Sequence, residues 1–169
     1  IDTADLQEMV ETTLYAVSTD DKKPAHTGEL FAIEPEKLTV VALDGYRLAI
    51  IEKPVKAAKE ISIIIPAKTL SEVVKLFGEE DGVVHIAANR RFVVFSNEKY
   101  TVISRLIEGE FLDYKRVIPE GFKTRVTVDV RDFVNTIERA SLIITERLKN
   151  PLRITFDGNI TVRCQTTLG

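Results

Sequence analysis

The chain has 169 residues, of which 44% are hydrophobic and 29% are charged, and its formal net charge is −3 at pH 7. No apolar run approaches the ~20 residues that a membrane helix needs, and the first residues lack the basic and apolar regions of a secretory signal peptide. The lone Cys164 excludes an internal disulfide, and the negative charge excludes a general attraction to nucleic acid. We therefore expect an ordinary globular protein of a reducing compartment, whose function composition leaves open.

The first part of the chain predicts a helix followed by three strands. Apolar residues recur at helical spacing over 5–17, with Thr3 placed to cap the helix and Asp5 in its first turn. Three segments rich in apolar and β-branched residues then predict strands at 29–33, 38–43 and 46–53.

The last two of these strands are joined at Asp44-Gly45, in the stretch VVALDGYRLAI at 40–50. Asp-Gly between two apolar runs is the strongest short-range signal for a β-hairpin, because Gly takes positive φ freely and Asp tolerates it. We expect a tight turn here, with the second strand opening at Tyr46.

The same order of elements begins again at 61–65, a β-branched strand. Pro66 ends this strand and begins a helix at a position where its missing N–H costs nothing. One face of the helix carries Leu70, Val73, Val74 and Phe77, and Gly78 is placed as its C′ residue. Further strands are expected at 83–88, 92–96 and 100–107.

A third round is predicted to open with a strand at 124–128, after which Asp129 caps a helix. The apolar face of this helix consists of Phe133, Ile137, Ala140 and Ile144. A hairpin of 152–156 and 160–165 follows, turning through Asp157-Gly158-Asn159.

Three rounds of one helix followed by antiparallel strands amount to a structural repeat, in which 4–43 and 130–169 are the most alike. A helix gains roughly 1.5–3 kcal/mol for each apolar side chain that it buries against a sheet. One round of a helix and its strands makes too few such contacts to fold stably by itself. We therefore expect an α+β fold with two rounds in each domain, so that the third round is half of a second domain.

Four long segments resemble the bacterial DNA polymerase III beta subunit, the replicative sliding clamp family. They are VVALDGYRLAI (40–50), IIIPAKTL (63–70), ISRLIEGEFLDYKRVIP (103–119) and ITERLKNPLRI (144–154). Their order and spacing are nearly those of the family, and the resemblance spans essentially the whole chain. It implies the DNA-clamp fold, with helices on one face of curved sheets. Residues 1–119 would be the family's complete middle domain and 120–169 the first half of its third domain.

The resemblance also implies a function: a processivity factor of bacterial DNA replication, located in the cytoplasm. In the family, two three-domain subunits form a ring that encircles duplex DNA without reading its sequence. The implied partners are the DNA polymerase III alpha subunit, the clamp loader and other proteins carrying a clamp-binding peptide, with no membrane partner and no cofactor. The alternative is a peptide-docking scaffold that does not encircle DNA, which the acidic helix at 5–17 leaves open.

Carried over residue by residue, the family's peptide pocket has members in four parts of this chain. They are Leu43, Gly45, Tyr46, Arg47 and Leu48 of the hairpin, Leu112, Arg116 and Val117 near 103–119, Leu148, and His26. Apolar walls and the stems of two arginines suit a Leu or Phe anchor. Leu112 stands where proline is common in the family, Leu43 where threonine is common, and His26 where the residue is usually apolar. These departures change which peptide the pocket prefers.

DNA contact is expected from lysines, for which Lys22, Lys23, Lys68 and Lys75 are the best candidates. The alternative interpretation of each is an ordinary solvent-exposed lysine that contacts no phosphate. An enzyme is the rival from another class, but His26 and His85 have no partner at the spacing of a metal site or a catalytic triad. We therefore expect no catalytic residues and no metal site.

Overall fold

The computed structural model describes residues 1–78, 82–144 and 151–165. The chain divides into two compact units, Ile1–Ile118 and Pro119–Gly169, which are called unit 1 and unit 2 below. Across the described ranges, no helix combines the length and the apolar character that a membrane crossing requires.

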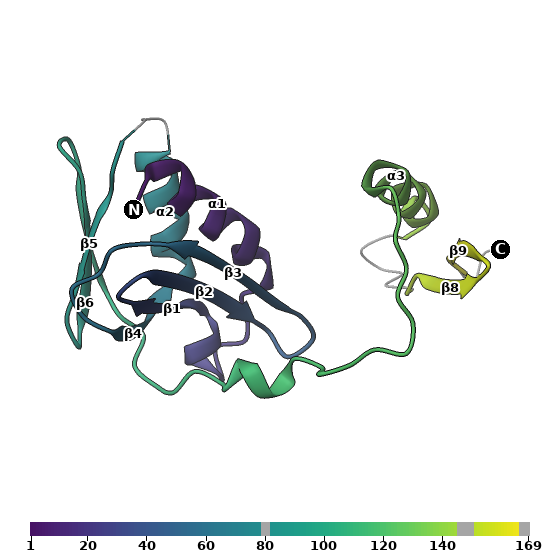
Figure 1. Cartoon of the computed structure of the whole chain (residues 1–169), viewed down its shortest axis with the longest axis horizontal. Coiled ribbons are helices and arrows are strands. Elements are labelled where there is room, and N and C mark those ends of the chain that lie inside the picture. Colours follow the sequence, from purple (N-terminus) through teal and green to yellow (C-terminus); the bar gives the residue numbers. More distant parts are fainter. Residues whose placement is uncertain (79–81, 145–150, 166–169) are drawn as a thin grey trace. The chain divides into compact units, whose positions relative to one another are not determined.

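The described residues of unit 1 form two antiparallel sheets (Figure 1). The four-stranded sheet has the order β3-β2-β1-β4, formed by β1 (Gly28–Glu34), β2 (Lys37–Leu43), β3 (Leu48–Pro54) and β4 (Ile61–Pro66). The three-stranded sheet has the order β5-β6-β7, formed by β5 (His85–Ala88), β6 (Phe92–Ser96) and β7 (Thr101–Arg105). The predicted α+β class is thus confirmed.

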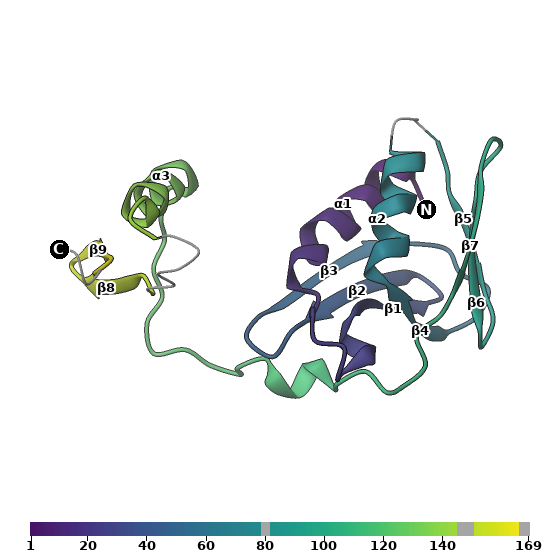
Figure 2. The same cartoon turned by 180° about the vertical axis from the view of Figure 1, so that it is seen from behind.

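Two helices, α1 (Thr3–Thr13) and α2 (Ala67–Phe77), lie side by side against the four-stranded sheet (Figures 1 and 2). Helix α1 packs on β2 and β3, whereas α2 packs on β1 and β4. The described part of unit 1 also contains the short 3₁₀ helices η1 (Leu14–Ala16), η2 (Pro24–His26) and η3 (Tyr114–Val117).

The main hydrophobic core joins both helices and both sheets. Met9 of α1, Phe31 of β1, Phe77 of α2 and Phe95 of β6 are each at most 1% exposed and belong to the same cluster. Burial of such side chains contributes roughly 1.5–3 kcal/mol each. Both rounds of unit 1 thus contribute to this main core, and a second, small cluster of Ala16, Ala42 and Ala49 lies within the first round.

In unit 1, the segment before each helix pairs with a segment of the other round. β4 precedes α2 but pairs with β1 of the first round, in a register that matches Gly28 with Pro66. Asp2 precedes α1 and bridges Val83, just before β5 of the second round. Each helix is therefore preceded by a segment that pairs with the other round, as an approximate dyad between the two rounds requires.

Two predictions about helix ends are wrong. Thr3 is the first residue of α1 rather than its N-cap, and its hydroxyl donates to the Gly82 carbonyl oxygen at 3.0 Å. The bridge between Asp2 and Val83 holds Thr3 close to that carbonyl. Gly78 is the C-cap of α2 with a φ of −67°, so it lies in the right-handed region rather than in the left-handed conformation of a C′ glycine.

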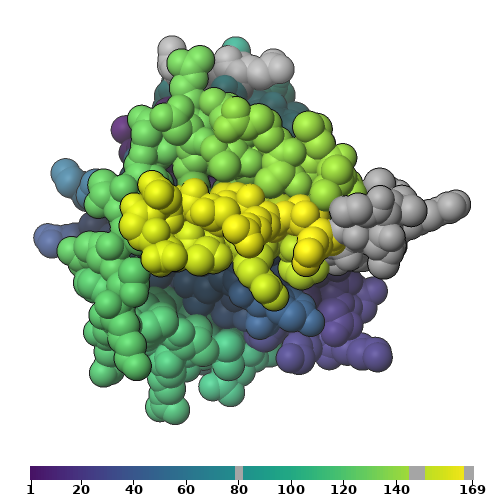
Figure 3. Space-filling model, turned by 90° about the vertical axis from the view of Figure 1, so that its right-hand side faces the viewer, coloured from purple at the N-terminus to yellow at the C-terminus, as the bar shows by residue number. Residues whose placement is uncertain are grey.

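Unit 2 contains α3 (Val130–Ser141) and a hairpin of β8 (Arg153–Asp157) and β9 (Asn159–Arg163). The predicted cap is confirmed, since the Asp129 carboxylate accepts a hydrogen bond from the Asp132 backbone N–H at 3.0 Å. Figure 3 shows the yellow hairpin alongside the yellow-green helix, and α3 contacts β9.

The strand predicted at 124–128 does not form, and its residues are exposed. A strand needs a partner for its backbone N–H and C=O groups. The equivalent strand of unit 1, β4, obtains that partner from the other round. Among the described residues of unit 2 there is one round, so 124–128 has no second set of strands with which to pair.

Candidate functional site

The turn between β2 and β3 spans 44–47, because β3 begins at Leu48 and not at Tyr46 as predicted. Asp44 causes the difference. Its Oδ1 accepts hydrogen bonds from the backbone N–H groups of Tyr46 at 3.0 Å and of Arg47 at 3.1 Å. These amides are thereby withdrawn from the strand ladder. Gly45 has a φ of +93°, which a residue with a side chain rarely adopts.

The Arg47 side chain is held from two directions. Its Nε donates to Asp44 Oδ2 at 2.9 Å, and its guanidinium carbon lies 5.5 Å from the centroid of the Tyr15 ring. Hydrogen bonds from the Tyr46 backbone, and then from Arg47, lower the pKa of Asp44 despite its partial desolvation, so the carboxylate stays charged. The turn therefore presents a fixed arginine beside Tyr46, whose side chain is 99% exposed.

The two leucines of the hairpin differ in accessibility. Leu43 and Leu48 face each other as the last pair of the β2–β3 ladder. Leu43 is only 3% exposed and is packed within the sheet, whereas Leu48 is half-buried. Of these two leucines, Leu48 is therefore the one that offers surface to a ligand.

The segment around η3 also presents apolar surface. Leu112 is 46% exposed and Val117 is 53% exposed. Arg116 Nε lies 2.9 Å from Asp113 Oδ2, which repeats the pairing of Arg47 with Asp44 three residues before it. No hydrogen bond or ion pair between described residues joins η3 directly to the 44–47 turn.

His26 of η2 contacts the same segment through Phe111. The two ring centroids are 5.6 Å apart and the rings are inclined at 68°, an edge-to-face arrangement. Burial, and secondarily the Lys23 charge, lower the pKa of His26, so this histidine is neutral at pH 7 and serves as part of an apolar wall. Leu148 lies outside the described residues.

Tyr15 and Phe111 are site residues that the sequence interpretation missed. Tyr15 follows α1 in sequence and lies 32 positions before Arg47, so no local pattern connects them. Phe111 was overlooked although it directly precedes Leu112 in a segment of mostly charged and polar residues. An exposed aromatic residue at the end of an amphipathic helix was the only signal for Tyr15.

The four candidate lysines for DNA contact are all exposed. Lys22 and Lys23 lie in the loop before η2, and Lys68 and Lys75 lie on α2. Lys75 pairs with Glu72 at 2.9 Å, which partly neutralises its charge.

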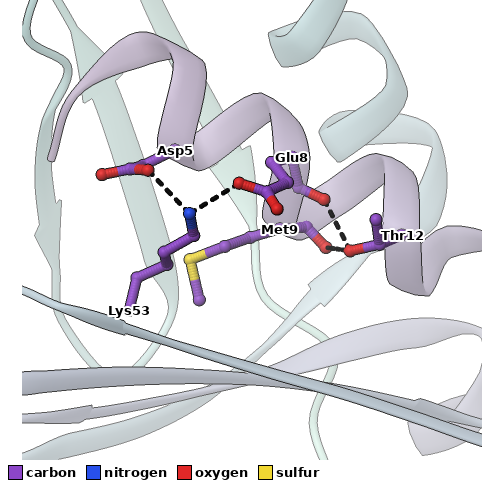
Figure 4. A network of polar contacts seen from close by, with 5 residues as sticks. All are labelled: Asp5, Glu8, Met9, Thr12 and Lys53. Atoms are coloured by element: carbon purple, nitrogen blue, oxygen red, sulfur yellow. Dashed lines mark hydrogen bonds and ion pairs between the residues drawn. The ribbon is translucent and has the colours of Figure 1, made fainter.

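Two acidic residues of α1, Asp5 and Glu8, pair with a lysine of the sheet. Figure 4 shows Lys53 of β3 reaching between Asp5 and Glu8, with its Nζ at 2.9 Å from Asp5 Oδ1 and 2.5 Å from Glu8 Oε2. These two acids raise the pKa of Lys53, Glu8 contributing first. This pairing reduces the net negative charge of α1. Among the described residues, no group of three or more His, Cys, Asp or Glu side chains could hold a metal ion.

Glu29 of β1 is an ionisable group inside the protein, with no exposed surface. The Thr13 hydroxyl donates to its Oε1 at 3.0 Å, while Oε2 has no hydrogen-bond partner among the described residues. Burial raises the pKa of Glu29 to about 8, against a smaller opposing effect of Thr13. At neutral pH this side chain is therefore mostly protonated.

Comparison with known families identifies the class of protein. Residues 1–113 match the model of the DNA polymerase III beta subunit, central domain. The chain is 30% identical over 151 residues to the beta sliding clamp of Bacillus subtilis, covering 88% of this chain and 40% of the relative. It thus spans less than half the length of that curated relative.

Solved structures agree with this match. A putative DNA polymerase III beta subunit of Eubacterium rectale superimposes with a TM-score of 0.91 at 33% identity, covering all of this chain and 47% of that one. A sliding clamp of Bartonella birtlesii, bound to griselimycin, has a TM-score of 0.83 at 31% identity, covering 93% of this chain and 44% of that one. The fold is that of sliding clamps, and the chain belongs to the DNA polymerase III beta subunit family.

Proposed function

We propose that this chain is part of a replicative sliding clamp, in which 1–119 form the middle domain and 120–169 the first half of the third domain. The complete protein would be a cytoplasmic processivity factor that forms a homodimeric ring around duplex DNA. It would tether the DNA polymerase III alpha subunit, and it would also bind the clamp loader and other proteins that carry a clamp-binding peptide. The family match over most of the chain supports this assignment.

The peptide would dock at the 44–47 turn and the segment around η3. The observation that carries this proposal is the turn itself, which Asp44 holds in place while Tyr46 projects outward at 99% exposure. A rigid turn binds a peptide without first losing conformational entropy of its own. Leu48, Leu112 and Val117 supply exposed apolar surface for a Leu or Phe anchor.

The clamp would act mechanically, without chemistry of its own. Contacts of Lys22, Lys23, Lys68 and Lys75 with phosphates would be weak and independent of sequence, which allows the ring to slide. Each phosphate neutralised would make the DNA affinity fall by about 0.9 log units per log unit of salt. A scaffold that docks peptides without encircling DNA is the second candidate, because the acidic α1 carries no basic residue.

Peptide docking is tested by fluorescence anisotropy with a labelled peptide that ends in Leu-Phe. We expect a dissociation constant on the order of micromolar or weaker, near −8 kcal/mol. Arg47→Ala and Leu48→Ala should each weaken binding, whereas Lys59→Ala, in the exposed loop before β4, should leave it unchanged. If Arg47→Ala and Leu48→Ala bound the peptide as tightly as Lys59→Ala and the unchanged chain do, the proposed docking site would be contradicted.

Encirclement is tested separately with the longer protein that the family's ring requires. After loading on nicked circular DNA, a ring should be released when the circle is linearised. Equal release from circular and linear DNA would favour the scaffold.

A further inference from the structure

The contacts that hold Arg47 in place leave one edge of its guanidinium available for hydrogen bonds to a ligand. Asp44 occupies Nε through Oδ2, while its Oδ1 is already bonded to two backbone N–H groups. The guanidinium carbon lies over the face of the Tyr15 ring, 5.5 Å from the ring centroid. Neither Nη1 nor Nη2 has a hydrogen bond or ion pair within the described part of unit 1. These two nitrogens form the end of a planar fork that matches the two oxygens of a carboxylate.

Arg116 provides an internal comparison. Its Nε makes the same 2.9 Å contact with an aspartate three residues earlier, Asp113. Its side chain is 85% exposed, against 55% for Arg47, and among the described contacts no ring lies beneath it. Arg47 therefore has less rotamer freedom left to lose when a ligand binds, and it is the better prepared of the two.

We propose that Arg47, positioned by Tyr15 and Asp44, binds a carboxylate of the docked peptide next to the apolar anchor. This proposal rests on the docking site proposed above and names the chemistry of its partner. The carboxylate comes from the C-terminus of the peptide or from an acidic side chain beside the anchor. Tyr15 and Asp44 act through Arg47 and are positioning residues.

The charge of Asp44 decides how the carboxylate is recognised. Asp44 cancels most of the long-range attraction of Arg47, since the two charged groups are 2.9 Å apart. Selectivity must then come from two directed hydrogen bonds, which act only on contact. The preference for a carboxylate should accordingly weaken only in part as the salt concentration rises, because charges in contact are screened less than charges that attract over a distance.

The experiment uses the 169-residue chain and two pairs of labelled peptides. The first pair ends in Leu-Phe with a free carboxylate or with an amide. The second pair is amidated and carries Glu or Gln next to the Leu-Phe anchor. We expect the carboxylate member of at least one pair to bind up to about fivefold more tightly, the range of exposed charge pairs. The pair that shows the preference identifies the source of the carboxylate.

Variants of Tyr15 test its positioning role. Tyr15→Leu should reduce the carboxylate preference toward one while leaving the affinity for amidated Leu-Phe peptide nearly unchanged. Tyr15→Phe keeps the ring and should restore the preference. Phe92→Leu, on β6 of the other sheet, is the matched control for loss of an exposed aromatic side chain.

The outcomes separate this inference from the docking proposal. If neither pair shows a preference while Leu48→Ala weakens both members, docking stands and carboxylate recognition is wrong. A preference that persists in Tyr15→Leu would remove Tyr15 from the site, and one that vanishes at 0.5 M salt would show long-range attraction instead of directed bonds. Should Arg47→Ala and Leu48→Ala bind every peptide as the unchanged chain does, both proposals fail.

Discussion

Units 1 and 2 are built from the same round of a helix followed by antiparallel strands, but they differ in burial. In unit 1, α1 contributes Leu6, Met9 and Val10 to the core, each at most 1% exposed. In unit 2, helix α3 has a pronounced apolar face, yet none of its residues is buried. The difference indicates that one round supplies an apolar surface and that a second round is needed to cover it.

The segments that precede the helices differ in the same way. β4 precedes α2 and is hydrogen-bonded to β1 from the first round. The segment 124–128 precedes α3 and remains without a strand partner among the described residues. Strand pairing and helix packing thus both require two rounds, which explains why the main core of unit 1 is shared between them.

The largest expected effect comes from truncating a shared core residue. Phe31→Ala should destabilise unit 1 by about 3–5 kcal/mol, because Phe31 has no exposed surface and its loss leaves a cavity. Phe133→Ala, the matched change in the partly buried position of α3, should cost less than about 1 kcal/mol. Urea unfolding followed by circular dichroism measures both, and similar costs would contradict the difference between the units.

Glu29→Gln should stabilise unit 1 in a pH-dependent way. Folding raises the pKa of Glu29 from 4.5 to about 8, so the unfolded chain loses the proton first and stability falls as the pH rises between these values. Glutamine keeps the shape without this penalty. Its advantage should be small at pH 4.5 and reach at most about 5 kcal/mol above pH 8.

Unfolding at pH 5, 7 and 9 checks the change at Glu29, with Glu36→Gln in the exposed turn between β1 and β2 as the control. An advantage that does not grow with pH would mean that Glu29 is ionised in the folded protein.

Removing the cap of α3 should have a smaller effect. Asp129→Ala removes the acceptor of the Asp132 N–H and should cost about 1 kcal/mol of helix stability. Because α3 lies in unit 2, where every residue that the structure describes is at least partly exposed, this loss should lower the helical signal of unit 2 while the unfolding midpoint of unit 1 stays the same. Asp129→Asn should retain most of the helix. Loss of unit 1 stability in Asp129→Ala would show that the two units are coupled.

The sequence predicted those features that depend on local pattern. β6 has the predicted bounds at 92–96, and Asp129 is the predicted cap, because alternation and capping are read within a few residues. The prediction of a strand at 124–128 was wrong because strand pairing depends on residues far away in the sequence. The start of β3 was wrong because the hydrogen bonds of Asp44 compete with the ladder.

The same distinction between local and distant features applies to the candidate site. Resemblance to the family indicated the turn and η3 from contiguous motifs. Neither pattern nor resemblance indicated the contact of Tyr15 with Arg47, or the buried pair of Thr13 and Glu29, since each joins residues from separate elements.

Residue-resolved amide hydrogen exchange of the 169-residue chain tests most directly whether two rounds are needed for a stable domain. The account predicts that amides of β1, β2 and β4 exchange only when unit 1 unfolds as a whole, while those of α3 and β9 exchange orders of magnitude faster through local opening. Protection of α3 and β9 equal to that of β1 would show that one round is stable alone, and would contradict the account.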